Sequence, residues 1–504
     1  MHGEYGNNRG KLDIWMLGIT IVIGGQYFSW NAGLATGFVS YFIAYLLVAA
    51  AYLTLCCCTA EITGALPFAG GAYGLSRCTL GFFPGFIIGC CEALEYIAYV
   101  ATTTLVLADM IVSSVPSLEG YEPLIWALFY ITALWFHIRG GQVFWRFNLF
   151  IGAVSLLIVV IYSLGSLSFV NFSAYTAHDP SLYFVGGFTN FMKMFPLAGW
   201  FFVGVEALSL ASDDVPHPKT TVPIAQVACV ITLTVSGVMV YFITASLDNA
   251  GGIAGLASQL VPLDYGFELM FKITTSTATW LSFPATYATA FGFIWCYGKL
   301  IHAMSTSRLL PAVLSTTSDR FETPYIALLA GSTVSYAICV LVYCVPVINK
   351  YLFSICITSA FAAYTGQCIG YISLKMNYRN IKSSHFQSPF GICGAIFSMT
   401  VWIFGIVCVA GYQGNGSIEI LSFLIIVGVL TIFYHAYAKK RQTFSAKENK
   451  VLLVAHVMKF NAARFNGKHK TKVVGSRTTK NQSSVGNAKS HATSKASNVS
   501  LVET

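Results

Sequence analysis

Three glutamates lie within long apolar runs of the chain, where charged residues are rare. Glu206 ends the apolar stretch 195–206, and Glu92 and Glu95 stand about one helical turn apart in the run 80–113. Burying a carboxylate among apolar residues costs free energy unless a proton or another cation neutralises it. Glu206, Glu95 and Glu92 are therefore candidates for carrying a proton, and Glu206 also for holding an ammonium group. Purely structural pairing is the alternative, which we favour for Glu92 and Glu95.

Two apolar runs are interrupted by residues that weaken helices. Gly24-Gly25 precedes the polar and aromatic stretch 26–31, and Pro196 and Gly204 fall within the second run. Glycines cost a helix about 1 kcal/mol each, and an interrupted helix exposes backbone groups that a small polar substrate can use. Glycines that only allow close helix packing are the alternative. The residues expected to bind substrate are Gly24, Gly25, Gln26, Tyr27, Phe28, Asn31, Phe201, Phe202, Gly204 and Glu206.

The composition indicates that bilayer-crossing helices position these residues. Hydrophobic residues make up 56% of the chain and charged residues 10%, whereas soluble domains carry about 25% charge. Apolar runs of roughly 20 residues indicate spans, and each span must be helical to satisfy its own backbone. We therefore expect an all-α polytopic membrane protein with about twelve spans. They run at about 12–35, 38–62, 80–113, 122–137, 143–169, 188–212, 222–247, 277–308, 324–346, 350–374, 389–411 and 416–438, with a short helix expected within 248–275.

Basic residues gather in alternate loops, which by the positive-inside rule places that side and both termini in the cytoplasm. Residues 438–504 hold 14 of the 29 Lys and Arg residues of the chain. We divide the chain into a cytoplasmic N-terminus 1–11, a transmembrane transporter domain 12–438 and a basic, largely disordered cytoplasmic tail 439–504. The expected location is the plasma membrane. The tail is expected to contact membrane lipid rather than nucleic acid.

Several other classes of function are excluded by what the sequence lacks. The ten histidines are scattered and form no cluster that could hold a metal. The glycine-rich pieces lack the Lys-Ser/Thr of a phosphate loop, so ATP does not drive transport. The cysteines lie mostly within apolar spans as small buried hydrophobes. We expect no cofactor, no metal and no enzymatic activity.

Four stretches, in this order, resemble the amino acid–polyamine–organocation superfamily over about residues 12–440. The first is similar to the ethanolamine permease branch, in which a Gly-acidic-aromatic-Phe-Gly-Trp-Asn pattern is typical. The stretches are Ile23-Gly24-Gly25-Gln26-Tyr27-Phe28-Ser29-Trp30-Asn31; Ala60-Glu61-Ile62-Thr63-Gly64-Ala65-Leu66-Pro67 with Ala69-Gly70-Gly71-Ala72-Tyr73; Trp200-Phe201-Phe202-Val203-Gly204-Val205-Glu206 with Asp213-Asp214-Val215 and His217-Pro218; and Ser305-Thr306-Ser307-Arg308 with Leu310-Pro311.

This resemblance implies a five-plus-five inverted repeat, with discontinuous first and sixth helices and two extra helices. It also implies that substrate sits between the first and sixth spans. The chain departs from the ethanolamine pattern at Gln26, where the pattern has an acidic residue. That change removes one partner for an ammonium group.

Three functions are compatible with these features. The first is a secondary carrier of ethanolamine or another small amine-bearing metabolite, coupled to H⁺ or Na⁺. The second is a general amino acid permease, in which backbone N–H groups at Gly24 and Gly25 hold the substrate carboxylate. The third is a nutrient sensor with a permease fold that binds its ligand without transporting it. Uptake into vesicles separates transport from sensing, and competition by ethanolamine separates the first two.

Overall fold

The protein is described by a computed structural model that covers residues 9–67, 70–176, 179–248, 251–377, 383, 385–445 and 448–450. These residues form helices and loops, without a strand among them. The α-helices are α1 Lys11–Val22, α2 Phe38–Ala65, α3 Gly71–Leu80, α4 Phe82–Ser114, α5 Glu122–Arg139, α6 Gly141–Ser166, α7 Phe172–Tyr175, α8 Gly187–Met194, α9 Pro218–Ala245, α10 Gly252–Ala257, α11 Asp264–Phe271, α12 Thr275–Thr306, α13 Tyr325–Cys344, α14 Asn349–Asn377, α15 Gly391–Tyr412 and α16 Ile418–Ala436.

Each of the twelve expected spans coincides with helical structure among the described residues. Nine helical segments are long and apolar enough to cross a membrane, and a tenth counts if the bent pair Lys11–Gln26 and Trp30–Thr36 is one span. The other two expected spans are the helices α5 and α12, which do not belong to that set. Polar and charged residues in both helices, such as Glu122 and Arg139 at the ends of α5, lower their hydropathy.

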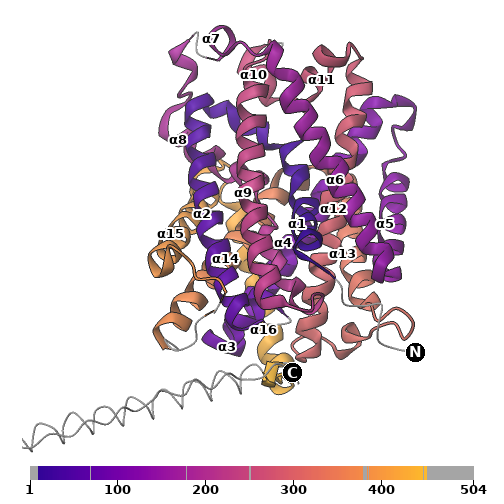
Figure 1. The fold of residues 1–504 in the computed structure, drawn as a ribbon, viewed down its shortest axis with the longest axis vertical. Helices are drawn as coiled ribbons and strands as arrows, with labels where there is room; N and C mark the ends of the chain where they lie inside the picture. The colour runs from indigo at the N-terminus through magenta and orange to yellow at the C-terminus, as the bar shows by residue number, and fades with distance from the viewer. Residues whose placement is uncertain are drawn as a thin grey trace, which may run out of the picture. The chain divides into compact units, whose positions relative to one another are not determined.

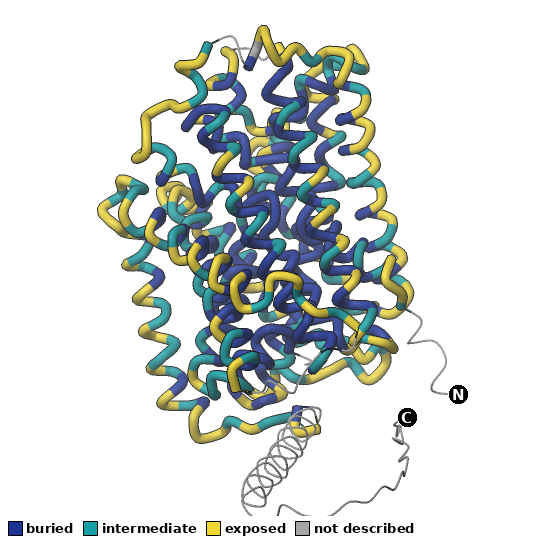
Figure 2. The backbone as a smooth tube through the Cα atoms, turned by 60° about the vertical axis from the view of Figure 1, so that its left-hand side comes forward, coloured by how far each residue is buried: buried dark blue, intermediate teal, exposed yellow. Residues whose placement is uncertain are grey.

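The helix α9 runs along the height of the bundle (Figure 1), and buried residues lie inside while exposed ones lie on the outside (Figure 2). The outward faces are apolar: on α16, Leu421, Ile425, Val429 and Ile432 are all more than half exposed. Soluble proteins rarely leave so continuous an apolar surface uncovered. Lipid is the solvent that such a surface fits.

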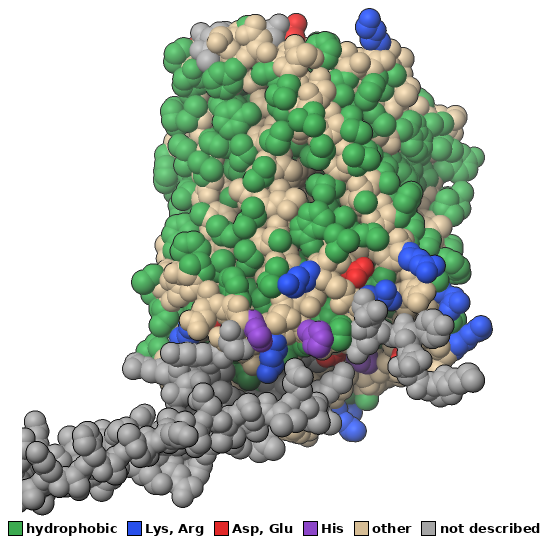
Figure 3. Space-filling model, in the orientation of Figure 1, with side chains coloured by type: hydrophobic (Ala, Val, Ile, Leu, Met, Phe, Trp, Pro, Cys, Tyr) green, Lys and Arg blue, Asp and Glu red, His purple; other side chains and the backbone are tan. Residues whose placement is uncertain are grey.

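Lys and Arg side chains gather at one end of the bundle, below a broad apolar band (Figure 3). The short helix α3 and the 3₁₀-helix η10 (Ala438–Lys440) lie at this end, and α10 and α11 lie at the opposite end (Figure 1). We call the end with α3 and η10 the basic end, and the end with α10 and α11 the opposite end. The helix α3 was not expected as a separate element, and Gly81, with a φ of +103°, joins it to α4.

The loop 248–275, where one short helix was expected, contains two, α10 and α11. Asp264 at the start of α11 is buried, and Thr279 of α12 donates a hydrogen bond of 2.6 Å to its Oδ2. Burial raises the pKa of Asp264 to about 7, and the nearby Glu268 carboxylate adds to the rise, whereas the Thr279 hydrogen bond lowers it. The folded protein therefore favours the protonated Asp264 carboxyl.

This shift predicts that the folded protein loses stability as pH rises from about 4, the usual pKa of an aspartate in an unfolded chain. Between that value and the folded pKa of about 7, the free energy of unfolding should fall by up to about 1.4 kcal/mol per pH unit. Asp264→Asn, which cannot ionise, should flatten this dependence. Thermal unfolding of both proteins between pH 4.5 and 8 measures it, and parallel curves would contradict the assignment.

Candidate functional site

The first helical break follows α1. The 3₁₀-helix η1 (Ile23–Gln26) and then η2 (Trp30–Thr36) continue the segment after a bend of 46°. Two adjacent glycines favour this break because glycine weakens a helix most of all residues except proline. The Gly24 amide freed by the break donates to Thr289 Oγ1 of α12 at 2.8 Å. Gly25 lies so close to the carbonyl oxygen of Trp200 that an added Cβ would overlap with it.

The second break lies between η6 (Phe195–Phe201) and η7 (Val205–Asp213). Pro196 stands in the first turn of η6, and Gly204 adopts a φ of +103°, which disfavours any residue with a side chain. Glu206 Oε2 accepts a hydrogen bond of 3.1 Å from the Gly204 amide. The carboxylate of Glu206 therefore satisfies a backbone group that the break leaves free.

The two breaks lie against each other. Phe28 after η1 makes an edge-on contact with Trp200, with ring centroids 5.4 Å apart. Trp30 of η2 and Phe201 are in contact at 5.2 Å. Two interruptions more than 160 residues apart in the sequence thus form one region in the interior of the bundle.

Three carboxyl groups gather next to the second break. Glu206, Glu95 and Glu92 are at most 3% exposed, and the carboxyl group of Glu95 lies close to that of Glu206. Tyr96 of α4 donates to Glu206 Oε1 at 3.3 Å. Tyr364 of α14 donates to Glu95 Oε1 at 2.5 Å.

The ion pairs found in the described part of the chain join none of these three glutamates to a Lys, Arg or His. Buried carboxylates need a counter-charge or a proton, since removing a charge from water costs several kcal/mol. Two carboxyl groups in contact cannot both be ionised without a cation between them. Such an arrangement can be completed by a proton or by a small cation such as an ammonium group.

Glu92 differs from the other two, because Gln367 of α14 donates to its Oε1 at 2.6 Å. On α4 and α14, Glu92 and Glu95 face Gln367 and Tyr364 at matching three-residue spacings. Side chains three residues apart share one face of a helix. This pairing holds α4 against α14. Structural pairing, which we favour for Glu92 and Glu95, stays a prediction.

Several other expected site residues bond away from the breaks. Asn31 donates to the carbonyl oxygens of Leu256 and Gln259, which ties η2 to the loop at the opposite end. The Tyr27 hydroxyl donates to the Ser155 carbonyl of α6 at 2.6 Å. The side chains of Asn31 and Tyr27 therefore anchor the first break to the loop at the opposite end and to α6.

The side chains of Gln26 and Phe202 contact helices α9 and α2. Gln26 Nε2 donates to the Leu233 carbonyl of α9 at 3.0 Å, and its Oε1 has no hydrogen-bond partner among the described residues. Phe202 packs on Tyr45 and Tyr52 of α2. Gln26 thus keeps one buried acceptor that a bound donor could use.

Sequence reasoning missed Tyr96, Tyr364, Thr289 and Trp200 as parts of this region. The first two are tyrosines in apolar helices, where aromatic residues are common, so their type carries little signal. The one usable signal is Tyr364 three residues before Gln367 in an apolar helix, which indicates a polar stripe. Nothing in the sequence says which helix that stripe faces.

Comparisons with known proteins give a consistent result. A family model described as amino acid permease matches residues 12–456. The chain is 25% identical over 337 residues to an uncharacterised transporter of Rhizobium meliloti, covering 63% of this chain and 69% of that protein. It is 24% identical to the methylthioribose transporter of Bacillus subtilis, covering 85% and 92%. It is also 24% identical to a branched-chain amino acid permease of Bacillus subtilis, covering 63% and 71%.

Proposed function

Because the chain belongs to the amino acid permease family, we propose that it is a secondary carrier of a small amine-bearing metabolite whose ammonium group is held at Glu206. The observation that carries this proposal is the buried group of Glu206, Glu95 and Glu92, which no basic side chain in the described residues neutralises. An ammonium group or a proton is the smallest partner that completes such a site.

The same carboxyl group gives a means of coupling. While substrate is bound, its ammonium neutralises Glu206, and after release a proton must take its place for the group to stay buried. Glu95 and the Tyr364 hydroxyl are next to Glu206 and provide a path for that proton. Proton coupling follows directly from the site, because buried carboxyl groups such as Glu206 and Glu95 can take up a proton.

The general amino acid permease remains the second candidate, since one relative is a branched-chain amino acid permease. In that function, the substrate carboxylate binds backbone N–H groups at the first break. The Gly24 amide is bonded to Thr289, and Gly25 abuts the Trp200 carbonyl. A carboxylate must displace these contacts, whereas Glu206 Oε1 is bonded to the Tyr96 side chain and not to the backbone.

We further propose that the basic end faces the cytoplasm of a cell whose plasma membrane holds the protein. The basic end carries Arg77 of α3 and Lys439, Lys440 and Arg441 in and after η10. Positively charged loops remain on the cytoplasmic side during insertion.

Uptake competition tests the substrate class. Purified protein in liposomes is given a labelled α-amino acid such as leucine, with excess ethanolamine, which lacks a carboxylate, or excess isocaproate, which lacks the amine. We expect ethanolamine to inhibit uptake and isocaproate to have no effect. An acidic interior should speed uptake, because the proton that replaces the substrate at Glu206 is then carried outward.

Inhibition by isocaproate alone would instead support recognition of the carboxylate at Gly24 and Gly25. Binding of these compounds without uptake would support a sensor. Liposomes that contain Glu206→Gln protein serve as the matched control, because the amide replaces the carboxylate without a change in size.

A further inference from the structure

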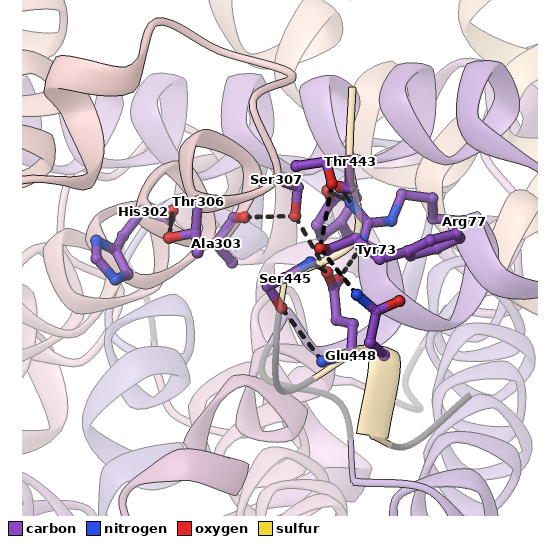
Figure 4. Close-up of polar contacts among 11 residues, drawn as sticks. Tyr73, Arg77, His302, Ala303, Thr306, Ser307, Thr443, Ser445 and Glu448 are labelled. Carbon is purple, nitrogen blue, oxygen red and sulfur yellow. Dashed lines mark hydrogen bonds and ion pairs between the residues drawn. The ribbon is translucent and has the colours of Figure 1, made fainter. Parts of the chain in front are cut away.

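Residues near the end of the described chain return to the bundle. After η10, the Thr443 amide donates to the Ser307 carbonyl at the end of α12 at 3.1 Å. We call the described residues 443–445 and 448–450 the C-terminal segment. It lies at the basic end, against α3 and the end of α12 (Figure 4).

A buried ion pair holds this segment. Glu448 pairs with the Arg77 guanidinium of α3, and the two residues are 4% and 1% exposed. Glu448 Oε2 also accepts from Ser307 Oγ at 3.3 Å and from the Ser445 amide at 2.8 Å. Arginine and glutamate are almost never so deeply buried unless they are paired, so the two residues depend on each other.

Arg77 is fixed on its other sides as well. Its Nη1 donates to the Tyr73 hydroxyl at 2.9 Å, and its guanidinium lies 4.8 Å from the Phe444 ring and 5.4 Å from the Phe82 ring. Phe444 and Phe82 are themselves in contact. The C-terminal segment thus supplies both an acidic partner and an aromatic face to one buried arginine.

The two elements joined by this segment are the neighbours of the two helical breaks. On α3, an added Cβ at Gly71 would meet Ser209 of η7, so α3 packs directly on the segment that carries Glu206. On α12, Thr289 binds the Gly24 amide of the first break. An opening of the basic end that separates η7 from α12 must therefore also disturb the contacts of the C-terminal segment with α3 and α12.

We propose that the C-terminal segment is an autoinhibitory latch: while Glu448 occupies Arg77, the basic end of the carrier stays closed, and release of the latch lets that end open. The proposal uses only the carrier function of the family and not the substrate class. In a carrier with two access states, a contact made in one state shifts the population towards it.

Thiol labelling tests the latch without any substrate. The full-length chain, with the exposed Cys344 and Cys393 and the partly exposed Cys78 changed to serine, is placed in nanodiscs. One reporter is added at a buried position, either Ser209→Cys beside α3 or Ser246→Cys at the opposite end. A membrane-impermeant maleimide reports how fast each site opens. Glu448→Gln should raise the labelling rate at Ser209→Cys about tenfold, as expected if the closed state loses a corresponding share of its population. It should leave the rate at Ser246→Cys unchanged.

Two further variants make the result specific. Phe444→Ala removes the ring beside Arg77 without leaving a charge unpaired, and it should also raise labelling at Ser209→Cys. Asp13→Asn removes an acid that caps α1 through the Gly10 amide at the same end, and it should change neither rate. Unchanged labelling at Ser209→Cys in both latch variants would overturn the proposal. So would an equal increase at both reporters, which indicates general loosening. The labelling rates do not depend on whether the carrier transports an amine. The latch proposal and the substrate proposal can therefore be contradicted independently.

Discussion

Glu206→Gln is expected to lower uptake of a cationic amine at subsaturating concentration by roughly 30-fold or more, the effect of losing one buried charge pair worth at least 2 kcal/mol. Glutamine keeps the size of the side chain and an oxygen that can accept from the Gly204 amide. The variant therefore removes the charge while it preserves the second break. Initial uptake rates, divided by the amount of protein at the cell surface, measure the effect.

Glu119→Gln is the matched control. Glu119 is exposed in the loop after η3 (Pro116–Leu118), so this substitution makes the same chemical change away from the site. Its uptake should equal that of the unchanged protein. Near-normal uptake by Glu206→Gln would remove Glu206 from the substrate site. A carrier that has lost proton coupling, but not binding, should still exchange substrate across the membrane, so an exchange assay separates the two roles of this carboxyl group.

Gly25→Ala is expected to reduce transport to below about a tenth of normal, because even one methyl group would overlap with the Trp200 carbonyl oxygen. Overpacking a tight contact costs about 1–3 kcal/mol, and here the obstacle is backbone that cannot rotate away. The two broken segments must separate, which disturbs the region where they meet. Uptake per surface molecule is the measurement, and Gly25→Leu should be at least as severe.

Gly428→Ala in α16 is the control, since an added Cβ there meets nothing within 4 Å. It should transport normally. If Gly25→Ala elutes as a single symmetric peak in size-exclusion chromatography and still transports normally, the breaks are not where substrate passes. Gly204→Ala provides a second test of the same region, because its φ of +103° strains any residue with a side chain.

The sequence determined the spans and the places where they break. The length of an apolar run and the presence of Gly24-Gly25 or of Pro196 and Gly204 are local properties, and they act within one helix. Both breaks are present in the structure within the expected stretches. The gathering of basic residues at one end could also be predicted, because successive loops lie on alternate sides of the membrane and the basic residues occur in every second loop.

Only the tertiary structure decided which side chains meet. Tyr364 and Glu95 are 269 residues apart, and Arg77 and Glu448 belong to an early helix and a segment assigned to the tail. Asn31, expected at the site, instead anchors the loop at the opposite end. The physical reason is that these helices are apolar over most of their surface, because both lipid and the bundle interior favour apolar residues. Such helices lack the amphipathic pattern that would show which face points inward, so their neighbours are fixed by packing alone.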